Sequence, residues 1–288
     1  MKKIWIKNTI KTLGAVFGVF GAISIFFPLT EVTRENIVPR SACLLIVIVI
    51  VAIVSFIWTR SMIKRKSISV FADVNTKIVF EYADIKQILD NACGDKNKIT
   101  VVVPVNTRLD KVFDRDYIRD GTIHRICLDY INTKIVQEKK HEFSLNKSIL
   151  ENVKIKKDGF AINGKLGDWF LLTSEELGIN GNIQFMFAEI FNLEEKNGKI
   201  VNSELKKEQY LSLIQMLIST IPDAVDHENQ VYIPLIGAGY GKIGTPENIM
   251  HIMNALLRFN KEALHQEIHV FINEKYKDST PIYRLIEY

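Results

Sequence analysis

Two long stretches without a charged residue dominate the first quarter of this chain. Residues 12–30 and residues 41–59 contain no Asp, Glu, Lys or Arg. A helix of this length, at about 1.5 Å per residue, spans about 28 Å, which is close to the hydrocarbon thickness of a bilayer. The second stretch is nearly continuous Leu, Ile and Val and ends at Trp58, an aromatic side chain suited to the membrane interface. We therefore predict a transmembrane hairpin with helices at about 12–30 and 41–59.

The basic residues around this hairpin predict its orientation. Four precede the first stretch and four follow the second within residues 60–66, whereas the connection 31–40 contains two basic and two acidic residues. The positive-inside rule then places both termini in the cytoplasm, as in a two-pass protein of the inner membrane. A cleaved signal peptide is the alternative, but no clear small-x-small cleavage site precedes Glu31 and a second apolar stretch follows.

Small residues in the first stretch offer a surface for helix association. Gly14 and Gly18 form a GxxxG pair, a spacing that lets membrane helices approach closely. Neither stretch contains an ionisable residue, which argues against a transporter built from these two helices. We expect an anchor, or a part that acts by assembling.

The net charge of +4 divides unevenly along the chain. Residues 1–66 contain ten basic and two acidic residues, which leaves 27 basic and 31 acidic residues in 67–288. The pI of about 8.8 is therefore set by the hairpin and does not indicate a nucleic-acid-binding surface. Residues 67–288 are long enough for one sizeable cytoplasmic domain.

Apolar runs and helical stripes in that domain alternate. We predict helices at 203–221, with a stripe of Leu205, Leu213, Ile214, Leu217 and Ile221, and at 246–260, with a stripe of Ile249, Met253, Leu256 and Phe259. The second opens with Thr245 as N-cap and Pro246 as the first helical residue. This order predicts an α/β fold with a largely parallel or mixed sheet flanked by helices. The predicted strands are 77–82, 99–105, 168–173, 184–191, 231–236 and 267–273.

Two strand ends carry residues suited to a ligand. The late strand runs into Gly237, Gly239, Gly241 and Gly244 before a helix begins, and exposed backbone N–H groups beside a helix N-terminus suit a diphosphate. A structural tight turn is the alternative. The loop is not a Walker A motif, because Ile243 follows Lys242, and it is not a Rossmann fingerprint, because it precedes only the final strand.

The second strand end presents an asparagine. The run VVVPVN ends at Asn106, whose amide can bind ribose hydroxyls or cap the next turn. On its own, the capping role is the simpler interpretation.

Together, these segments resemble the macrodomain family. Asp84-Ile85 after one strand, Asn106 after VVVPVN, and a late strand ending in IPLIGAGYGKIG follow the order of its ligand-binding segments. The resemblance implies a macrodomain-like mixed sheet in which Asp84 and Ile85 hold adenine, Asn106 holds the distal ribose, and the glycine loop cradles the diphosphate of an ADP-ribose derivative. The loop residues so implied are Gly237, Ala238, Gly239, Tyr240 and Gly241.

A membrane hairpin (1–66) followed by such a domain (67–288) further resembles the membrane-bound effectors of Thoeris antiphage systems. This resemblance implies that a TIR-domain partner consumes NAD and releases an ADP-ribose-type signal. The macro domain would sense the signal, the protein would form homo-oligomers, and the membrane would be disrupted in abortive infection. It implies no further cofactor and no nucleic-acid partner.

Catalysis is not expected from these residues. Many macrodomains that hydrolyse ADP-ribose conjugates have a second Asn shortly after the first, whereas residues 106–110 read Asn-Thr-Arg-Leu-Asp. We therefore predict a signal-binding effector without catalytic residues or a metal site. A membrane-tethered macrodomain hydrolase and a passive anchor for ADP-ribosylated partners stay open as alternatives. The charged segment 108–158 is longer than a compact macrodomain needs, which suggests a lid or an assembly surface.

Overall fold

The chain divides into two compact units, Met1–Arg65 and Lys66–Tyr288. Residues 49–58 of the first unit are helical. Among the described residues no helix has both the length and the apolar character needed to cross a bilayer, and most of the two predicted membrane helices lies outside those residues. The computed structural model describes residues 10, 14, 49–58, 60, 61, 64–92, 98–107, 118–139, 166–177, 179, 182–191, 193–196, 199–202, 206–238 and 243–287.

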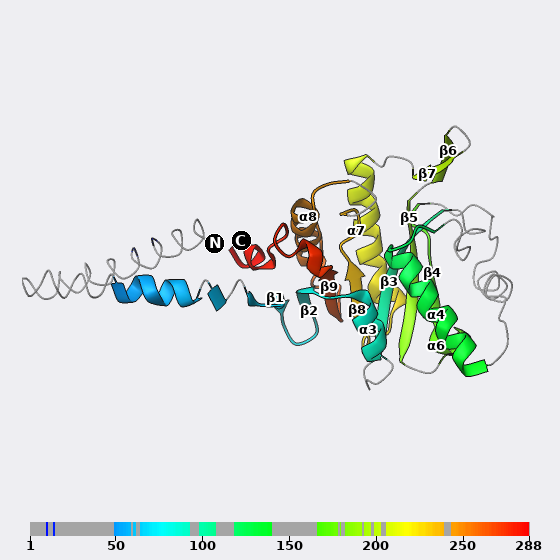
Figure 1. Ribbon diagram of the computed structural model, residues 1–288, viewed down its shortest axis with the longest axis horizontal. Coiled ribbons are helices and arrows are strands. Elements are labelled where there is room, and N and C mark those ends of the chain that lie inside the picture. Colours follow the sequence, from blue (N-terminus) through cyan, green and yellow to red (C-terminus); the bar gives the residue numbers. More distant parts are fainter. Residues whose placement is uncertain are drawn as a thin grey trace, which may run out of the picture. The chain divides into compact units, whose positions relative to one another are not determined.

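A seven-stranded mixed sheet forms the centre of the second unit, in the order β1-β2-β9-β8-β3-β5-β4 (Figure 1). The strands from β2 to β5 in this order run parallel, whereas β1 and β4 pair antiparallel at the two sides. The carboxyl ends of the parallel strands therefore meet at one edge, which we call the carboxyl edge. The strands are β1 (Ser67–Ala72), β2 (Lys77–Tyr82), β3 (Ile99–Asn106), β4 (Trp169–Thr173), β5 (Ile183–Phe191), β8 (Gln230–Pro234) and β9 (Glu267–Ile272).

Helices cover both faces of this sheet because neighbouring residues of each central strand point to opposite sides. Val102 packs in one apolar cluster with residues of α7 and α8, whereas Val101 and Val103 pack in another with residues of α3 and α4. The remaining elements are α3 (Ile85–Ala92), α4 (Ile123–Lys139), α6 (Ser174–Leu177), α7 (Lys207–Ala224), α8 (Pro246–Phe259), the hairpin β6 (Leu193–Lys196) and β7 (Lys199–Asn202), and the 3-10 helices η4 (Glu274–Tyr276) and η5 (Ile282–Glu287).

The sequence patterns predicted the central strands closely. All six predicted strands are present, with ends that differ by at most two residues. The largest difference is at β8, which ends at Pro234 because the Ile236 N–H turns back to the Pro234 carbonyl at 2.7 Å. The predicted mixed α/β sheet flanked by helices is therefore confirmed.

The helix predictions need corrections. Helix α7 begins at Lys207 and continues through Pro222 to Ala224, and residues 203–205 of the predicted helix lie outside the described residues. In α8 the predicted stripe is wrong at its end, because Phe259 is 82% exposed and Leu257 is buried instead. The predicted stripe advances only ten residues in three steps, which falls short of 3.6 residues per turn, so its last residue rotates off the core.

Candidate functional site

The carboxyl edge brings together the three segments that the sequence singled out. Asp84 follows β2, Asn106 ends β3 and Gly237 follows β8. Along the edge these strands lie in the order β2, β9, β8 and β3. The end of β9 therefore lies between the segments of Asp84 and Gly237, and the strands that lead to Gly237 and Asn106 are neighbours. Ligands of open α/β sheets bind beyond the carboxyl ends of their strands, and this edge is therefore the candidate site.

Asp84 caps the helix that follows it. Its Oδ1 accepts a hydrogen bond from the Lys86 N–H at 2.8 Å, and its carbonyl accepts one from the Ile88 N–H at 3.1 Å. The first bond satisfies an N–H group that the first turn of α3 would otherwise leave without a partner, and the second is the first backbone hydrogen bond of the helix. Asp84 is half-buried, and only one of its two carboxylate oxygens takes part in the cap.

Ile85 differs from Asp84 because its side chain belongs to the core. It is only 4% exposed and packs in the apolar cluster of α3 and α4. Its side chain therefore anchors the start of α3 beneath Asp84. Any contact of Ile85 with a ligand at the edge has to come from its backbone.

Asn106 lies where the pairing of β3 and β5 changes register. Val105 pairs with Glu189, whereas Asn106 pairs with Phe191, so one residue of β5 is skipped. The next residue closes this irregularity, because the Thr107 N–H donates to the Phe191 carbonyl at 2.9 Å. Asn106 is 9% exposed. A strand irregularity of this kind re-aims side chains at sheet edges, and here it does so at the predicted ribose-binding residue.

The segment between β8 and α8, residues 235–245, is the glycine loop. Gly237 has φ of +87°, a left-handed conformation that favours glycine. The Gly237 carbonyl accepts a hydrogen bond from the Ile243 N–H at 3.2 Å, which ties the two ends of the loop together. Ala238 packs against the core of the α7 and α8 face. The other predicted phosphate-binding residues, Gly239, Tyr240 and Gly241, lie outside the described residues.

Helix α8 begins directly after the glycine loop, as predicted. The Thr245 hydroxyl accepts a hydrogen bond from the Asn248 N–H, and Pro246 is the first helical residue. Glu247 in the first turn is paired with Arg284 from η5, and this hydrogen bond raises the pKa of the arginine. The carboxylate beside the loop is therefore neutralised, which leaves the positive end of the helix available to an anion.

Tyr210 is a loop-contacting residue that sequence reasoning missed. It lies in the first turn of α7, is fully buried, and donates a hydrogen bond from its hydroxyl to the Ile236 carbonyl at 2.8 Å. A signal for it was present in the sequence, because Tyr210 precedes Leu213, Ile214 and Leu217 on the same apolar stripe. A tyrosine in such a stripe usually finds a polar partner for its hydroxyl.

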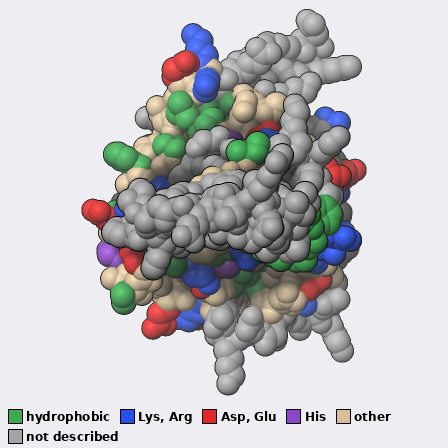
Figure 2. Space-filling model, turned by 90° about the vertical axis from the view of Figure 1, so that its left-hand side faces the viewer, with side chains coloured by type: hydrophobic (Ala, Val, Ile, Leu, Met, Phe, Trp, Pro, Cys, Tyr) green, Lys and Arg blue, Asp and Glu red, His purple; other side chains and the backbone are tan. Residues whose placement is uncertain are grey.

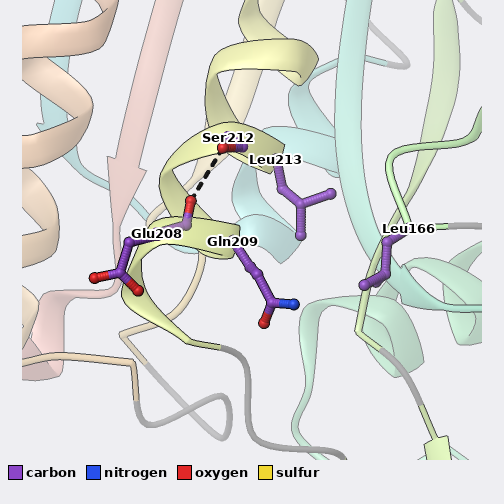
Figure 3. Close-up of a pocket in the computed structure, with 5 residues that line it drawn as sticks. All are labelled: Leu166, Glu208, Gln209, Ser212 and Leu213. Carbon is purple, nitrogen blue, oxygen red and sulfur yellow. Dashed lines mark hydrogen bonds between the residues drawn. The ribbon is translucent and has the colours of Figure 1, made fainter.

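Two hollows lie near these elements. One, of about 370 Å³, lies between Leu166 and the first turns of α7, where Ser212 donates to the Glu208 carbonyl (Figure 3). None of the predicted ligand residues lines it. The other, of about 190 Å³, is lined by Ala83 next to Asp84, together with Glu81 and Tyr232. It adjoins the predicted adenine-binding segment on the α3 face of the sheet.

Charges of both signs lie on one face of the molecule. On the described part of the face shown in Figure 2, basic and acidic side chains are interspersed and form no single patch. Among the described residues no group of three or more His, Cys, Asp or Glu side chains is placed to hold a metal ion.

The chain matches a model of a known protein family. The family model described as "Thoeris protein ThsA, Macro domain" matches residues 85–273, which is more than half of the chain. No curated protein matches the chain.

Solved structures give weaker likenesses. A mutant macrodomain of Oceanobacillus iheyensis has a TM-score of 0.46 at 12% identity, covering 77% of this chain and 95% of that one. The same macrodomain with ADP has a TM-score of 0.44 at 11% identity, covering 77% and 93%. The Trypanosoma brucei macrodomain in complex with ADP-ribose has a TM-score of 0.34 at 11% identity, covering 74% and 68%. Since these scores are below 0.5, the family assignment rests on the family model.

Proposed function

The chain belongs to the Thoeris ThsA macro-domain family, and from this premise we propose that it binds an ADP-ribose-type nucleotide at its carboxyl edge. The observation that carries the proposal is the glycine loop. Its ends are tied by the bond between Gly237 and Ile243, and it leads directly into the capped start of α8. Such a loop offers backbone donors and a helix terminus to a diphosphate.

The proposed roles follow the row of strand ends. Asp84 would accept a hydrogen bond from adenine with the carboxylate oxygen that does not cap α3, and Ile85 would contribute its backbone. The glycine loop, from Gly237 to Gly241, would hold the diphosphate. Asn106 would bind the distal ribose through its amide, at the place where β3 changes register.

The proposed output is membrane damage. The N-terminal unit would form the two-pass hairpin in the inner membrane, with both termini in the cytoplasm. A TIR-domain partner would make the nucleotide signal from NAD, and its binding would bring copies of the chain together. Tethered helices are then concentrated in the bilayer, where the small-residue face at Gly14 and Gly18 favours association. The support for this part is the sequence pattern of residues 1–66 and the Thoeris context of the family.

The binding step can be tested on the full chain in phospholipid nanodiscs by calorimetry with ADP-ribose. Asn106→Ala is expected to weaken binding by about tenfold, since a lost hydrogen bond to a buried partner costs about 1–3 kcal/mol. Asn229→Ala is the matched control. Asn229 is also a buried asparagine beside a strand, but it lies at the opposite edge of the sheet and donates to Thr100 at 3.2 Å. The absence of any heat signal with ADP-ribose, or equal losses in both variants, would overturn the proposal.

The output requires a cellular measurement. Co-expression with a TIR-domain protein and infection should collapse the membrane potential only when the hairpin is intact. Gly14→Leu together with Gly18→Leu is expected to preserve ADP-ribose binding and to reduce this collapse. Release of free ADP-ribose from a conjugate by the purified chain would instead favour the hydrolase. Loss of potential without the TIR partner would contradict signal gating.

A further inference from the structure

We propose that Tyr210 is a positioning residue that sets the orientation of the glycine loop and thereby its preference for phosphate. The proposal rests on the proposed function, because it concerns the part of the site that would hold the diphosphate. Tyr210 comes from α7, which contributes none of the residues that the sequence predicted for the ligand.

Two contacts hold the start of the loop against Tyr210. The Tyr210 hydroxyl donates to the Ile236 carbonyl at 2.8 Å, and burial raises the pKa of this phenol, so it stays a neutral donor. The ring also borders Gly237, since a Cβ there would lie 3.1 Å from Tyr210 Cε2 and 3.3 Å from Ile243 Cδ1. The ring therefore fills the space that the glycine leaves open.

The hydroxyl fixes the direction of a backbone donor. The Ile236 carbonyl and the Gly237 N–H belong to the same planar peptide and point in opposite directions. When Tyr210 holds the carbonyl, the Gly237 N–H points away from the tyrosine. Within the described part of the chain, no group accepts a hydrogen bond from this N–H. The Gly237 N–H is thus a donor at the start of the loop whose direction Tyr210 fixes.

The rest of the described loop follows from this orientation. The Ala238 N–H turns back toward the Leu235 carbonyl at 3.4 Å, and the Ile243 N–H closes onto the Gly237 carbonyl at 3.2 Å. Both bonds begin or end within two residues of the peptide that Tyr210 holds. Rotation of that peptide would turn the Gly237 N–H away from its present direction and disturb both of these bonds.

Phenylalanine at position 210 isolates the contribution of the hydroxyl. It would keep the ring beside Gly237 but leave the Ile236 carbonyl, in a residue that is 2% exposed, without its donor. A buried carbonyl without a partner is costly, so the peptide is expected to rotate toward another donor or water. The loop would then lose its prepared geometry while the fold is retained.

The test compares Tyr210→Phe with Tyr130→Phe in the full chain in nanodiscs. Tyr130 is a matched control in helix α4, because its hydroxyl donates to the Leu89 carbonyl at 3.1 Å on the other face of the sheet. Affinities are measured for ADP-ribose and for adenosine, which lacks the diphosphate. Tyr210→Phe should weaken ADP-ribose about tenfold and change adenosine less than twofold. Tyr130→Phe should change neither.

Hydrogen exchange of peptides covering 233–246 tests the same residue without a ligand. Tyr210→Phe should speed their exchange by at least about fivefold, whereas Tyr130→Phe should leave it unchanged. If wild type binds no ADP-ribose but exchange responds, the proposed function fails and the positioning role stands. Unchanged exchange, an unchanged ADP-ribose affinity, or equal losses for ADP-ribose and adenosine would overturn the role of Tyr210.

Discussion

The two ends of the candidate site are built in different ways. At the β2 end, Asp84 caps the helix that follows it, and both of its hydrogen bonds reach residues no more than four positions away. At the β8 end, the loop is held by residues far along the chain: the Leu235 N–H donates to the Phe271 carbonyl, and Tyr210 holds the Ile236 carbonyl. Local sequence therefore determines the geometry of the end at Asp84, whereas contacts between distant parts of the chain determine the geometry of the glycine loop.

The largest effect is expected from Gly237→Ala, which would break the packed end. Alanine is strained at φ of +87°, by about 1–2 kcal/mol, and its Cβ would press on the Tyr210 ring. We expect a loss of about 2 kcal/mol in the free energy of unfolding, measured with urea, and at least about tenfold weaker ADP-ribose binding. Gly121→Ala is the control, because Gly121 also has a positive φ (+74°) but has no atoms near its Cβ position. Normal binding in Gly237→Ala would show that the loop does not depend on this conformation.

An intermediate effect is expected at the locally built end, where two variants separate capping from ligand contact. Asp84→Ala removes the cap of α3 and should cost about 1 kcal/mol of stability, whereas Asp84→Asn keeps a good cap. Both should weaken ADP-ribose binding if the second carboxylate oxygen meets adenine. Urea unfolding and calorimetry on the same samples give the two values. Normal binding in Asp84→Asn would reduce Asp84 to a helix cap.

The smallest effect is expected at the opposite edge of the sheet, where the parallel strands begin, far from both ends of the candidate site. Burial alone would raise the pKa of Glu267, but hydrogen bonds and charge from Lys77 and His269 outweigh it and lower the pKa. A carboxyl group whose pKa is lower in the folded state stabilises the fold at pH values above the pKa of the unfolded chain, about 4.3. This contribution is lost as the pH falls from there through the lowered pKa of the folded state. Glu267→Gln should cost about 0.5 kcal/mol at pH 7, and less below pH 4. A change in ADP-ribose affinity would contradict the separation of the two edges.

The sequence was most informative where structure is local or periodic. Central strands such as Ile99–Asn106 were predicted because buried parallel strands are continuous apolar runs. The start of α8 was predicted from Thr245 and Pro246, which act within one turn. Strand β1 was missed, because its burial is irregular and a register shift between Ser69 and Phe71 breaks its alternation.

The candidate site was predictable only in part. Family resemblance pointed to Asp84, Asn106 and Gly237, and the topology places all three at one edge. It did not show that the Ile85 side chain is buried in the core, because a lone apolar residue after a strand suits either a ligand or a core. Tyr210 was missed as a contact of the glycine loop for another reason, although its apolar stripe indicated a buried tyrosine. Its partner Ile236 lies 26 residues away, and no periodic pattern links a helix to a loop across that separation.

The position of β1 determines where pulling forces enter the domain. β1 runs antiparallel to β2, so its first residue, Ser67, pairs with Glu81 near the carboxyl edge. The preceding Lys66 carbonyl accepts a hydrogen bond from the Tyr82 N–H at 2.8 Å, two residues before Asp84. Tension from the N-terminal unit would therefore load this bond first and peel β1 from the ligand end, one pair at a time. The end of the candidate site at Asp84 is thus also the end at which the N-terminal unit joins the sheet.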